Sequence, residues 1–258
     1  MSDFDLGDLR VSLSDFVAQV EIHRPPHNYF DATLIADLAT ALDRLDADPD
    51  CRVTLLCAEG KSFCAGADFS SPRIYDKQEG TAKLYANAVR LFAVRKPIVA
   101  AIEGSAIGGG LGLALAADFR VACAEARFSA NFVKLGTHAG FGITHTLPAL
   151  VGQQRASLML LTGRRLSGAE AFEWGLVDTL VERSEVRTAA RSLALEMAAN
   201  APLAVVATKE TLRGKLAEAV RLQTEIEFHK QNALFDTEDH QEGVSAVAQR
   251  RPGNFIGR

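Results

Sequence analysis

The stretch IEGSAIGGGLGLALAAD at residues 102–118 constrains the fold more than any other part of the chain. Three consecutive glycines and a fourth two positions later open a run that otherwise consists of leucine and alanine. Because glycine in a helix interior costs about 1 kcal/mol relative to alanine, its accumulation where a helix begins needs a physical reason. Three reasons are open: a phosphate-binding loop, tight packing of a helix against a sheet, or backbone N–H groups left free to hold an oxyanion.

Both phosphate-binding motifs fail at a required glycine. A G-x-G-x-x-G fingerprint read from Gly108 needs a glycine where Leu113 stands. A phosphate loop ending at Gly60-Lys61-Ser62 needs a glycine where Leu55 stands. A nucleotide-dependent enzyme is therefore disfavoured, and the packing and oxyanion explanations remain.

The hydrophobic pattern predicts strands that alternate with helices, and then a helical region. Strands are expected at 16–22, 53–60, 96–104 and 119–126, and helices at 32–45 with Asp31 as the cap, at 81–94 and at 110–118. Such alternation favours mainly parallel sheets. From about Gly142 we expect short helices that end at glycines, then longer ones at 184–199, 216–235 and 238–249.

Two segments of the chain share one plan. VTLLCAEGKSFCAGAD and PIVAAIEGSAIGGGLG each contain an apolar strand, Glu-Gly, a few small residues and a glycine turn. Two such strand–turn units lying side by side would present two bare backbone N–H groups to one point. This favours the oxyanion explanation for the glycine run.

Composition narrows the class of protein. The 258 residues are 48% hydrophobic and carry a net charge of −4, which gives no reason to expect a nucleic-acid partner. No apolar run reaches the length of a membrane span, and the acidic start MSDFDLGDLR has no signal-peptide core. The four cysteines lack metal-ligand spacing, so we expect buried thiols, no metal and a cytoplasmic location. We predict a core of residues 1–195 and a helical lobe of residues 196–258 in one structural unit.

Several motifs in this order make the chain resemble the crotonase (enoyl-CoA hydratase/isomerase) superfamily. They are FCAGADF, AIEGSAIGGGLGLALAADFRVA, ARFSANFVKLG, LPALVG and LTGRRLSGAEAFEWGLVD. The resemblance implies an α/β fold, a spiral of repeated ββα units with a C-terminal helical lobe for trimerisation and coenzyme A closure. It also implies an acyl-CoA thioester substrate, with coenzyme A as part of that substrate and no further cofactor, and a homo-oligomer that is a trimer or a dimer of trimers.

The resemblance also assigns site residues. The N–H groups of Ala67 and Gly109 would form an oxyanion hole in which the thioester carbonyl is held while an enolate develops. Contacts to coenzyme A are implied for six residues: Asn28, Tyr29, Ala65, Asp68, Phe255 and Arg258. Read from residue type alone, Asp68 is also a turn-ordering carboxylate, and the arginine-rich tail is also a solvated terminus.

The chain departs from the family where hydratases resemble one another in two glutamates that add water. The matching positions hold Gly112 and Phe132, neither of which transfers a proton. A positioned acid or base is worth about 10²–10⁴ in rate, so we expect slow or absent hydration. The aspartate nucleophile of the 4-chlorobenzoyl-CoA dehalogenase branch would fall near Gly140 and is missing as well.

Other side chains are candidates to replace those glutamates. His138 and His145 lie in GTHAGFGITH, a stretch that usually lines the acyl pocket in this family, and histidine carries protons near neutral pH. Tyr75 and Tyr85 also follow the first glycine turn and could reach a pocket, although a surface or core position is the more typical one for each. Two alternatives stay open: an isomerase, hydrolase or lyase on a bulkier or aromatic acyl-CoA that uses His138, or a non-catalytic acyl-CoA-binding oligomer.

Overall fold

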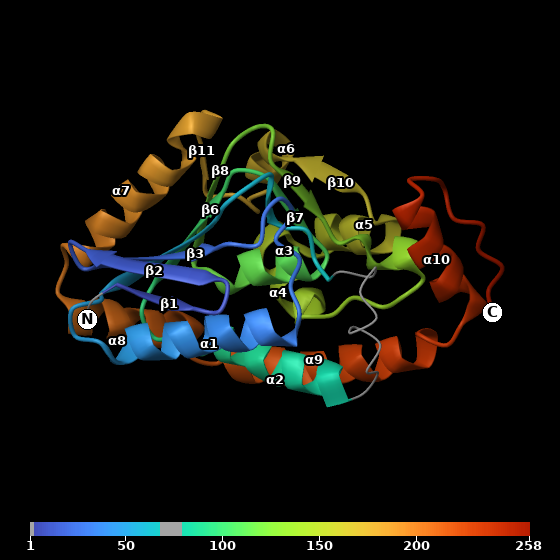
Figure 1. The fold of residues 1–258 in the computed structure, drawn as a ribbon, viewed down its shortest axis with the longest axis horizontal. Coiled ribbons are helices and arrows are strands. Elements are labelled where there is room, and N and C mark those ends of the chain that lie inside the picture. The colour runs from blue at the N-terminus through green and yellow to red at the C-terminus, as the bar shows by residue number, and fades with distance from the viewer. Residues whose placement is uncertain (1–2, 68–78) are drawn as a thin grey trace.

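The computed structural model describes residues 3–67 and 79–258, and it contains two sheets surrounded by helices (Figure 1). The larger sheet has the strand order β1-β2-β3-β4-β6-β8-β11. Its strands are β1 (Phe4–Leu6), β2 (Leu9–Ser14), β3 (Val17–Ile22), β4 (Val53–Ala58), β6 (Ile98–Ile102), β8 (Phe119–Ala122) and β11 (Thr179–Leu180). The strands from β3 to β11 pair in parallel, as predicted, whereas β1, β2 and β3 form an antiparallel meander that the sequence analysis missed.

The smaller sheet has the order β10-β9-β7-β5 and explains how the chain spirals. Its strands are β5 (Ser62–Cys64), β7 (Ser105–Ile107), β9 (Arg127–Ser129) and β10 (Arg165–Ser167). Three times in succession the chain places one strand in the larger sheet and the next in the smaller one, in the pairs β4–β5, β6–β7 and β8–β9. The pairs β4–β5 and β6–β7 are followed by helices, so a ββα unit repeats along the chain.

Helices cover both sheets and form the C-terminal part of the chain. They are α1 (Ala32–Ala47), α2 (Glu79–Phe92), α3 (Gly109–Ala116), α4 (Ile143–Val151), α5 (Gln153–Thr162), α6 (Gly168–Glu173), α7 (Val186–Ala198), α8 (Pro202–Arg213), α9 (Leu216–Leu234) and α10 (Glu238–Ala248), with the 3₁₀ turns η2 (Asn131–Leu135) and η3 (Arg183–Glu185). Helices α1, α2 and α9 lie side by side along one side of the molecule (Figure 1). The predicted boundary after residue 195 falls inside α7, and the sequence analysis missed α8.

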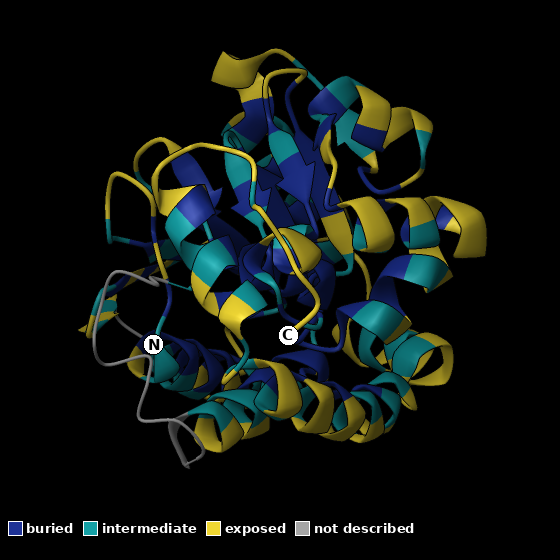
Figure 2. Cartoon of the chain, turned by 90° about the vertical axis from the view of Figure 1, so that its right-hand side faces the viewer, coloured by how far each residue is buried: buried dark blue, intermediate teal, exposed yellow. Residues whose placement is uncertain are grey.

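Local sequence signals explain where key helices begin. The Asp31 carboxylate accepts the Leu34 N–H at 2.8 Å, which confirms the predicted cap of α1. Helix α3 runs through the glycine-rich stretch, and all eight of its residues are buried. A helix buried all round belongs to a core, and α3 lies among the buried residues drawn dark blue in Figure 2. The four cysteines are buried free thiols, as predicted.

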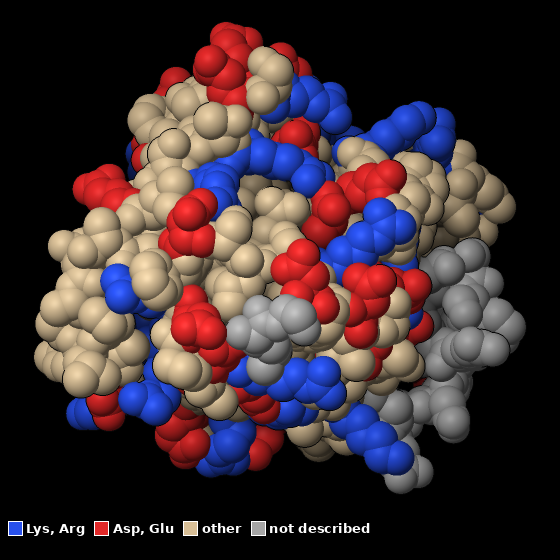
Figure 3. Space-filling model, turned by 60° about the vertical axis from the view of Figure 1, so that its left-hand side comes forward, with Lys and Arg blue, Asp and Glu red and all other residues tan. Residues whose placement is uncertain are grey.

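The surface of the described chain shows no strong separation of charge on the face drawn in Figure 3. Lysine and arginine side chains are interspersed there with aspartate and glutamate. Among the described residues, no helix has the length and apolar character needed to cross a bilayer.

Candidate functional site

The two strand–turn units of similar sequence lie next to each other. Strands β5 and β7 pair in parallel, and Ser62 is opposite Ser105. The turns that follow these strands touch: a Cβ atom placed on Gly66 would lie 2.8 Å from the Ile107 carbonyl oxygen and 3.9 Å from the Gly109 nitrogen. A Cβ on Gly110 would collide with the Cys64 carbonyl. Glycine is therefore required where the two backbones approach, and the predicted side-by-side arrangement is confirmed.

The backbone at the start of α3 offers hydrogen-bond donors. Gly108 has φ +56° and carries the chain into the helix, and its carbonyl accepts the Leu111 and Gly112 N–H groups. Within the described part of the chain, no protein acceptor is found for the N–H groups of Ala67 and Gly109. The first N–H groups of a helix lack intrahelical partners and carry partial positive charge. This arrangement can stabilise an oxyanion brought between the two turns.

A third segment, residues 27–30, runs along the first turn. The Ala65 N–H donates to the His27 carbonyl at 3.0 Å, and the Phe30 N–H donates to the Gly66 carbonyl at 2.9 Å. The structure thus gathers five predicted site residues into neighbouring backbone segments: Asn28, Tyr29, Ala65, Ala67 and Gly109. Tyr29 is exposed beside the His27 ring.

Asn28 cannot use its side chain for a ligand, which limits its predicted part in coenzyme A binding. The side chain is fully buried, and its oxygen accepts the Arg24 N–H at 2.9 Å. Its amide nitrogen donates to the Glu59 and Ser62 carbonyls at 2.7 and 2.6 Å. Asn28 therefore connects the 27–30 segment to the region around β5. Its backbone N–H also donates to the Arg24 carbonyl at 2.9 Å, which leaves only its carbonyl for a ligand.

Aromatic rings cover the second turn. A Cβ on Gly109 would collide with the Phe30 ring, and a Cβ on Gly108 would lie 3.9 Å from the Phe132 ring. A Cβ on Gly112 would lie 2.7 Å from the Cβ of Phe141. At the two positions that the resemblance matched to hydratase glutamates, this chain has Gly112, which packs against a phenylalanine, and Phe132.

The candidate proton carriers differ in their surroundings. The His138 Nδ1 lies 2.8 Å from the Ala139 carbonyl, which only accepts, so Nδ1 carries the proton and Nε2 of the neutral ring is the acceptor. The Tyr85 hydroxyl donates to Gln231 at 2.5 Å, and burial raises the pKa of this phenol far above its ordinary value. Cys64 adjoins the site, but burial raises the pKa of its thiol to about 12, which keeps it protonated.

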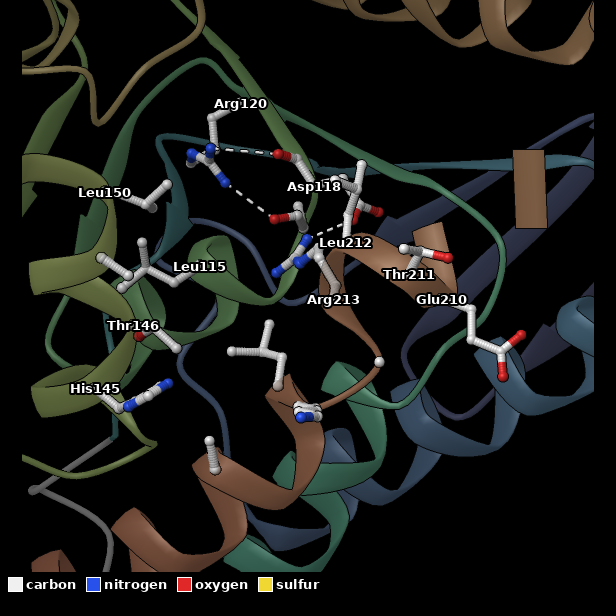
Figure 4. A pocket seen from close by; sticks show the side chains of 16 residues that line it. Leu115, Asp118, Arg120, His145, Thr146, Leu150, Glu210, Thr211, Leu212 and Arg213 are labelled. Atoms are coloured by element: carbon white, nitrogen blue, oxygen red, sulfur yellow. Dashed lines mark hydrogen bonds and ion pairs between the residues drawn. The ribbon is translucent and has the colours of Figure 1, made fainter. Parts of the chain in front are cut away.

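His145 lies in a different place from the glycine turns. It is exposed on the first turn of α4 and lines a cavity of about 950 Å³ at the C-terminal end of α3 (Figure 4). Neither glycine turn contributes to that cavity. Since α3 rises 1.5 Å per residue, Leu115 on the cavity wall lies about 9 Å along the helix from Gly109. The structure does not bring His145 to the predicted site.

The less exposed charged residues of this cavity already have ion-pair partners. The Arg120 side chain is 1% exposed and donates to the Leu176 and Ala117 carbonyls and to Asp178. Asp118 pairs with Arg213, beside Arg120 in Figure 4. Size alone would make this cavity the first choice for a ligand site. We prefer the glycine turns, because their donors are free and the largely buried charges of the cavity already have partners.

The C-terminal tail lies against α10. The Ile256 and Gly257 N–H groups donate to the Asp239 carboxylate at 2.7 and 2.8 Å. Arg258 is exposed and lies 3.3 Å from Glu238, and Phe255 is exposed. Helix α10 packs on η2, which carries Phe132. The predicted residues Asp68 and Tyr75 lie outside the described residues.

Three residues on or behind the second turn were not predicted from the sequence. Phe141 packs on Gly112, the Asn131 side-chain oxygen lies 3.3 Å from a Cβ placed on Gly108, and buried Glu227 of α9 accepts the Gly142 N–H at 2.7 Å. The GFG sequence at residues 140–142 was a possible signal, because a bulky residue between two glycines suggests unusual backbone there.

This fold and this pair of turns define a class of protein. The family model described as enoyl-CoA hydratase/isomerase matches residues 13–258. The chain belongs to this family, and the α/β fold predicted from the resemblance, with its spiral of ββα units, is confirmed.

Individual relatives cover nearly the whole chain. It is 39% identical over 253 residues to (E)-benzylidenesuccinyl-CoA hydratase of Thauera aromatica. The aligned region covers 96% of this chain and 98% of that protein. It is 33% identical over 250 residues to carnitinyl-CoA dehydratase of Salmonella enteritidis, covering 94% of this chain and 95% of that one. Among solved structures, an enoyl-CoA hydratase/isomerase from Pseudoalteromonas atlantica superposes with a TM-score of 0.88 at 31% identity, covering 97% of this chain and 100% of the other.

Proposed function

We propose that this protein binds an acyl-CoA thioester and stabilises its enolate with the N–H groups of Ala67 and Gly109. The observation that carries the proposal is the contact of the two glycine turns, in which the Cβ position of Gly66 lies 3.9 Å from the Gly109 nitrogen. Two donors from separate loops aimed at one oxygen favour the charge that develops when the α-carbon loses a proton. Membership of the enoyl-CoA hydratase/isomerase family supports an acyl-CoA substrate and an enzyme.

The acyl group is proposed to be bulky or aromatic. Phe30 and Phe132 lie against the turn at Gly108 and Gly109, and aromatic rings favour contact with other apolar, planar groups. The similarity to a relative named as a hydratase of benzylidenesuccinyl-CoA, whose acyl part is aromatic, supports the same class.

His138 is proposed as the proton carrier. Its Nε2 is left as the acceptor by the bond from Nδ1 to the Ala139 carbonyl, and an imidazole nitrogen with a free lone pair is what a general base needs. Gly112 and Phe132 offer no acid or base, so hydration of a small acyl group such as crotonyl-CoA is expected to be slow or absent. His145 has no part in this proposal.

A panel of thioesters tests the proposal. Crotonyl-CoA, a straight-chain octenoyl-CoA and cinnamoyl-CoA are each titrated for binding and assayed for turnover. Binding of cinnamoyl-CoA should shift its absorption to longer wavelength, because donors at the carbonyl polarise the conjugated system. Binding without that shift would contradict the oxyanion hole, and rapid crotonyl-CoA hydration would contradict the missing acid and base.

The panel also separates an enzyme from a binding protein. Tight binding of several esters with no product from any of them would favour a non-catalytic acyl-CoA-binding oligomer. If cinnamoyl-CoA is turned over, His138→Ala should abolish turnover while binding persists. Unchanged turnover in that variant would remove His138 from the mechanism. Assembly as a trimer or a dimer of trimers is part of the proposal and is tested by sedimentation velocity.

A further inference from the structure

Phe141 has an unusual backbone conformation beside the second glycine turn. Its ring is 1% exposed, and its backbone has φ +67°, a conformation that bulky residues rarely adopt. The ring lies 3.7 Å from a Cβ placed on Gly109 and 2.7 Å from one placed on Gly112. It also contacts the Phe30 and Phe92 rings, with centroids 5.8 and 6.4 Å away. Phe141 therefore fills the volume beside the first turn of α3.

One side of Phe141 is fixed by α2 and α9. Gly140 lies so close to the Tyr85 hydroxyl that any side chain would collide with it. That hydroxyl donates to the Gln231 oxygen at 2.5 Å, and the Gln231 nitrogen donates to the His138 carbonyl at 2.9 Å. The backbone just before Phe141 is thus in close contact with α2 and hydrogen-bonded to α9.

The other side of Phe141 is fixed by Glu227. This carboxylate, fully buried on α9, accepts the Gly142 N–H at 2.7 Å and the Thr144 N–H at 3.0 Å. A Cβ on Gly142 would lie 2.7 Å from the Val220 side chain, so α9 also limits this position sterically. Backbone outliers persist where the surroundings over-determine them, and they concentrate at functional sites.

We propose that Phe141 is a specificity-determining residue, which limits the size of the acyl group that fits beside the Gly109 donor. This inference rests on the proposed function, because it takes the Gly109 N–H as the group that holds the thioester carbonyl. The ring closes the volume on the α3 side of that donor. An acyl group that branches or extends in this direction meets the ring, and one that extends elsewhere does not.

Truncation of the ring would open this volume to a ligand. A cavity lined by apolar side chains stays free of water and accepts apolar molecules of matching size. The neighbours of such a cavity would be Phe30, Phe92 and the first turn of α3. In Phe141→Ala, an acyl extension too large for the wild-type protein should therefore occupy the space left by the ring.

The first test addresses the packing and needs no substrate. Gly112→Ala should lower the urea midpoint of unfolding in the wild-type background, because the added Cβ meets Phe141. In the Phe141→Gly background, which lacks both the ring and the Cβ atom, the same substitution should leave the midpoint unchanged or raise it, because alanine is the better helix former. The same sign in both backgrounds would overturn the contact on which the inference depends.

The second test addresses specificity. For wild type, Phe141→Leu and Phe141→Ala, kcat/KM or Kd is measured with a straight-chain acyl-CoA and with esters that carry added methyl or phenyl groups. Phe141→Ala should shift the ratio toward the larger esters at least tenfold, and Phe141→Leu should shift it less in the same direction. Phe172→Ala, which removes an exposed phenylalanine on α6, is the matched control and should leave the ratio unchanged.

The possible failures are distinguishable. A ratio that stays within twofold in both Phe141 variants, while acyl-CoA still binds, would overturn the inference and leave the proposed function standing. Failure of the wild-type protein to bind any acyl-CoA would overturn the proposed function and, with it, the inference. This would hold even if Gly112→Ala changed the urea midpoint in opposite directions in the two backgrounds. If Phe141→Ala does not fold, the predicted smaller shift in Phe141→Leu still decides the question.

Discussion

The two ends of α3 differ in the groups that surround them. At its N-terminal end, glycine backbone leaves N–H donors without a protein acceptor among the described residues, and phenylalanine rings surround them. At its C-terminal end, the Ala117 carbonyl accepts from Arg120, and Asp118 accepts from Ile98, Lys209 and Arg213. Cations near a helix C-terminus oppose its partial negative charge.

This contrast distinguishes charged groups that stabilise the fold from backbone donors that are free to bind a ligand. The C-terminal end has a cavity of about 950 Å³ and the largely buried charges of Asp118 and Arg120, yet both of these charges already have partners. At the N-terminal end, the side chains against Gly108 and Gly109 are an amide and phenylalanine rings, and the backbone donors are free. A ligand with developing negative charge therefore gains more at the N-terminal end, and four changes test whether the two ends really differ in this way.

The largest expected effect comes from Asp118. Its side chain is 9% exposed, and removing it in Asp118→Ala leaves Lys209 and Arg213 without their carboxylate and Ile98 without its acceptor. Burial already lowers the pKa of Lys209, which shows how unfavourable its unpaired charge would be. We expect unfolding in urea to show a loss of about 3–5 kcal/mol.

Glu210→Ala is the matched control for Asp118→Ala. This carboxylate is exposed and lines the same cavity, so its removal should change the free energy of unfolding by less than about 0.5 kcal/mol. Folded Asp118→Ala protein should still bind acyl-CoA with the wild-type Kd. A large loss of affinity would mean that the C-terminal end of α3 takes part in binding, which would contradict the proposed difference between the two ends.

The second change removes a donor at the other end. Ala67→Pro lacks the N–H group, whereas Ala67→Val adds side-chain bulk and keeps it. We expect kcat to fall about 10²–10³-fold in the proline variant, since one oxyanion donor contributes about 2.7–4 kcal/mol to the transition state. Equal losses in the two variants, measured on protein with matching thermal unfolding, would show that bulk and not the N–H group matters.

The parts of the fold that sequence could predict are those fixed by local pattern. The cap at Asp31, the strand at Val53–Ala58 and the buried helix α3 follow from side-chain periodicity and cap residues within one segment. The side-by-side placement of the two strand–turn units was predictable because their sequences share one plan, but the short strands β5 and β7 inside those units were not predicted. Backbone donors need only glycine and a turn, so the oxyanion prediction depends on few long-range details.

Other features depend on contacts between distant segments. Helix α8 was missed because none of its residues is buried, and it is attached by ion pairs from Lys209 and Arg213 to Asp118. Phe141 was missed because no local pattern says which ring packs on Gly112. His145 was chosen by residue type, but the orientation of α4 turns it toward the cavity rather than the glycine turns.

The third change concerns pH at the N-terminal side. Burial raises the pKa of Glu227 above its ordinary value of 4.5, although the Thr144 and Gly142 groups oppose that shift. The folded protein therefore holds this proton to a higher pH than the unfolded chain does. As pH rises from 4.5 through the raised value, the contribution of Glu227 to the free energy of unfolding should fall.

Glu227→Gln cannot ionise and should lack this part of the pH dependence. Urea unfolding of wild type and variant between pH 4 and pH 8 measures the difference in slope. Glu225→Gln, an exposed position on the same helix, should keep the wild-type slope. Parallel pH profiles of Glu227→Gln and wild type would show that burial does not raise the pKa of Glu227. Water would then reach this carboxylate more freely than the packing indicates.

The smallest expected effect comes from removing one exposed cation, either in the C-terminal tail or in the cavity at the C-terminal end of α3. Arg258 lies in the C-terminal tail and Lys215 lines the cavity, and both are exposed, so alanine at either position makes the same change in charge. If the tail contacts the phosphates of coenzyme A, Arg258→Ala should raise the Kd of an acyl-CoA about two- to fivefold, the range of an exposed ion pair. Lys215→Ala should leave that Kd unchanged, and both variants should keep kcat, because neither residue reaches the thioester. The reverse result, with Lys215 affecting Kd and Arg258 not, would move coenzyme A to the C-terminal end of α3 and remove the tail from the proposed site.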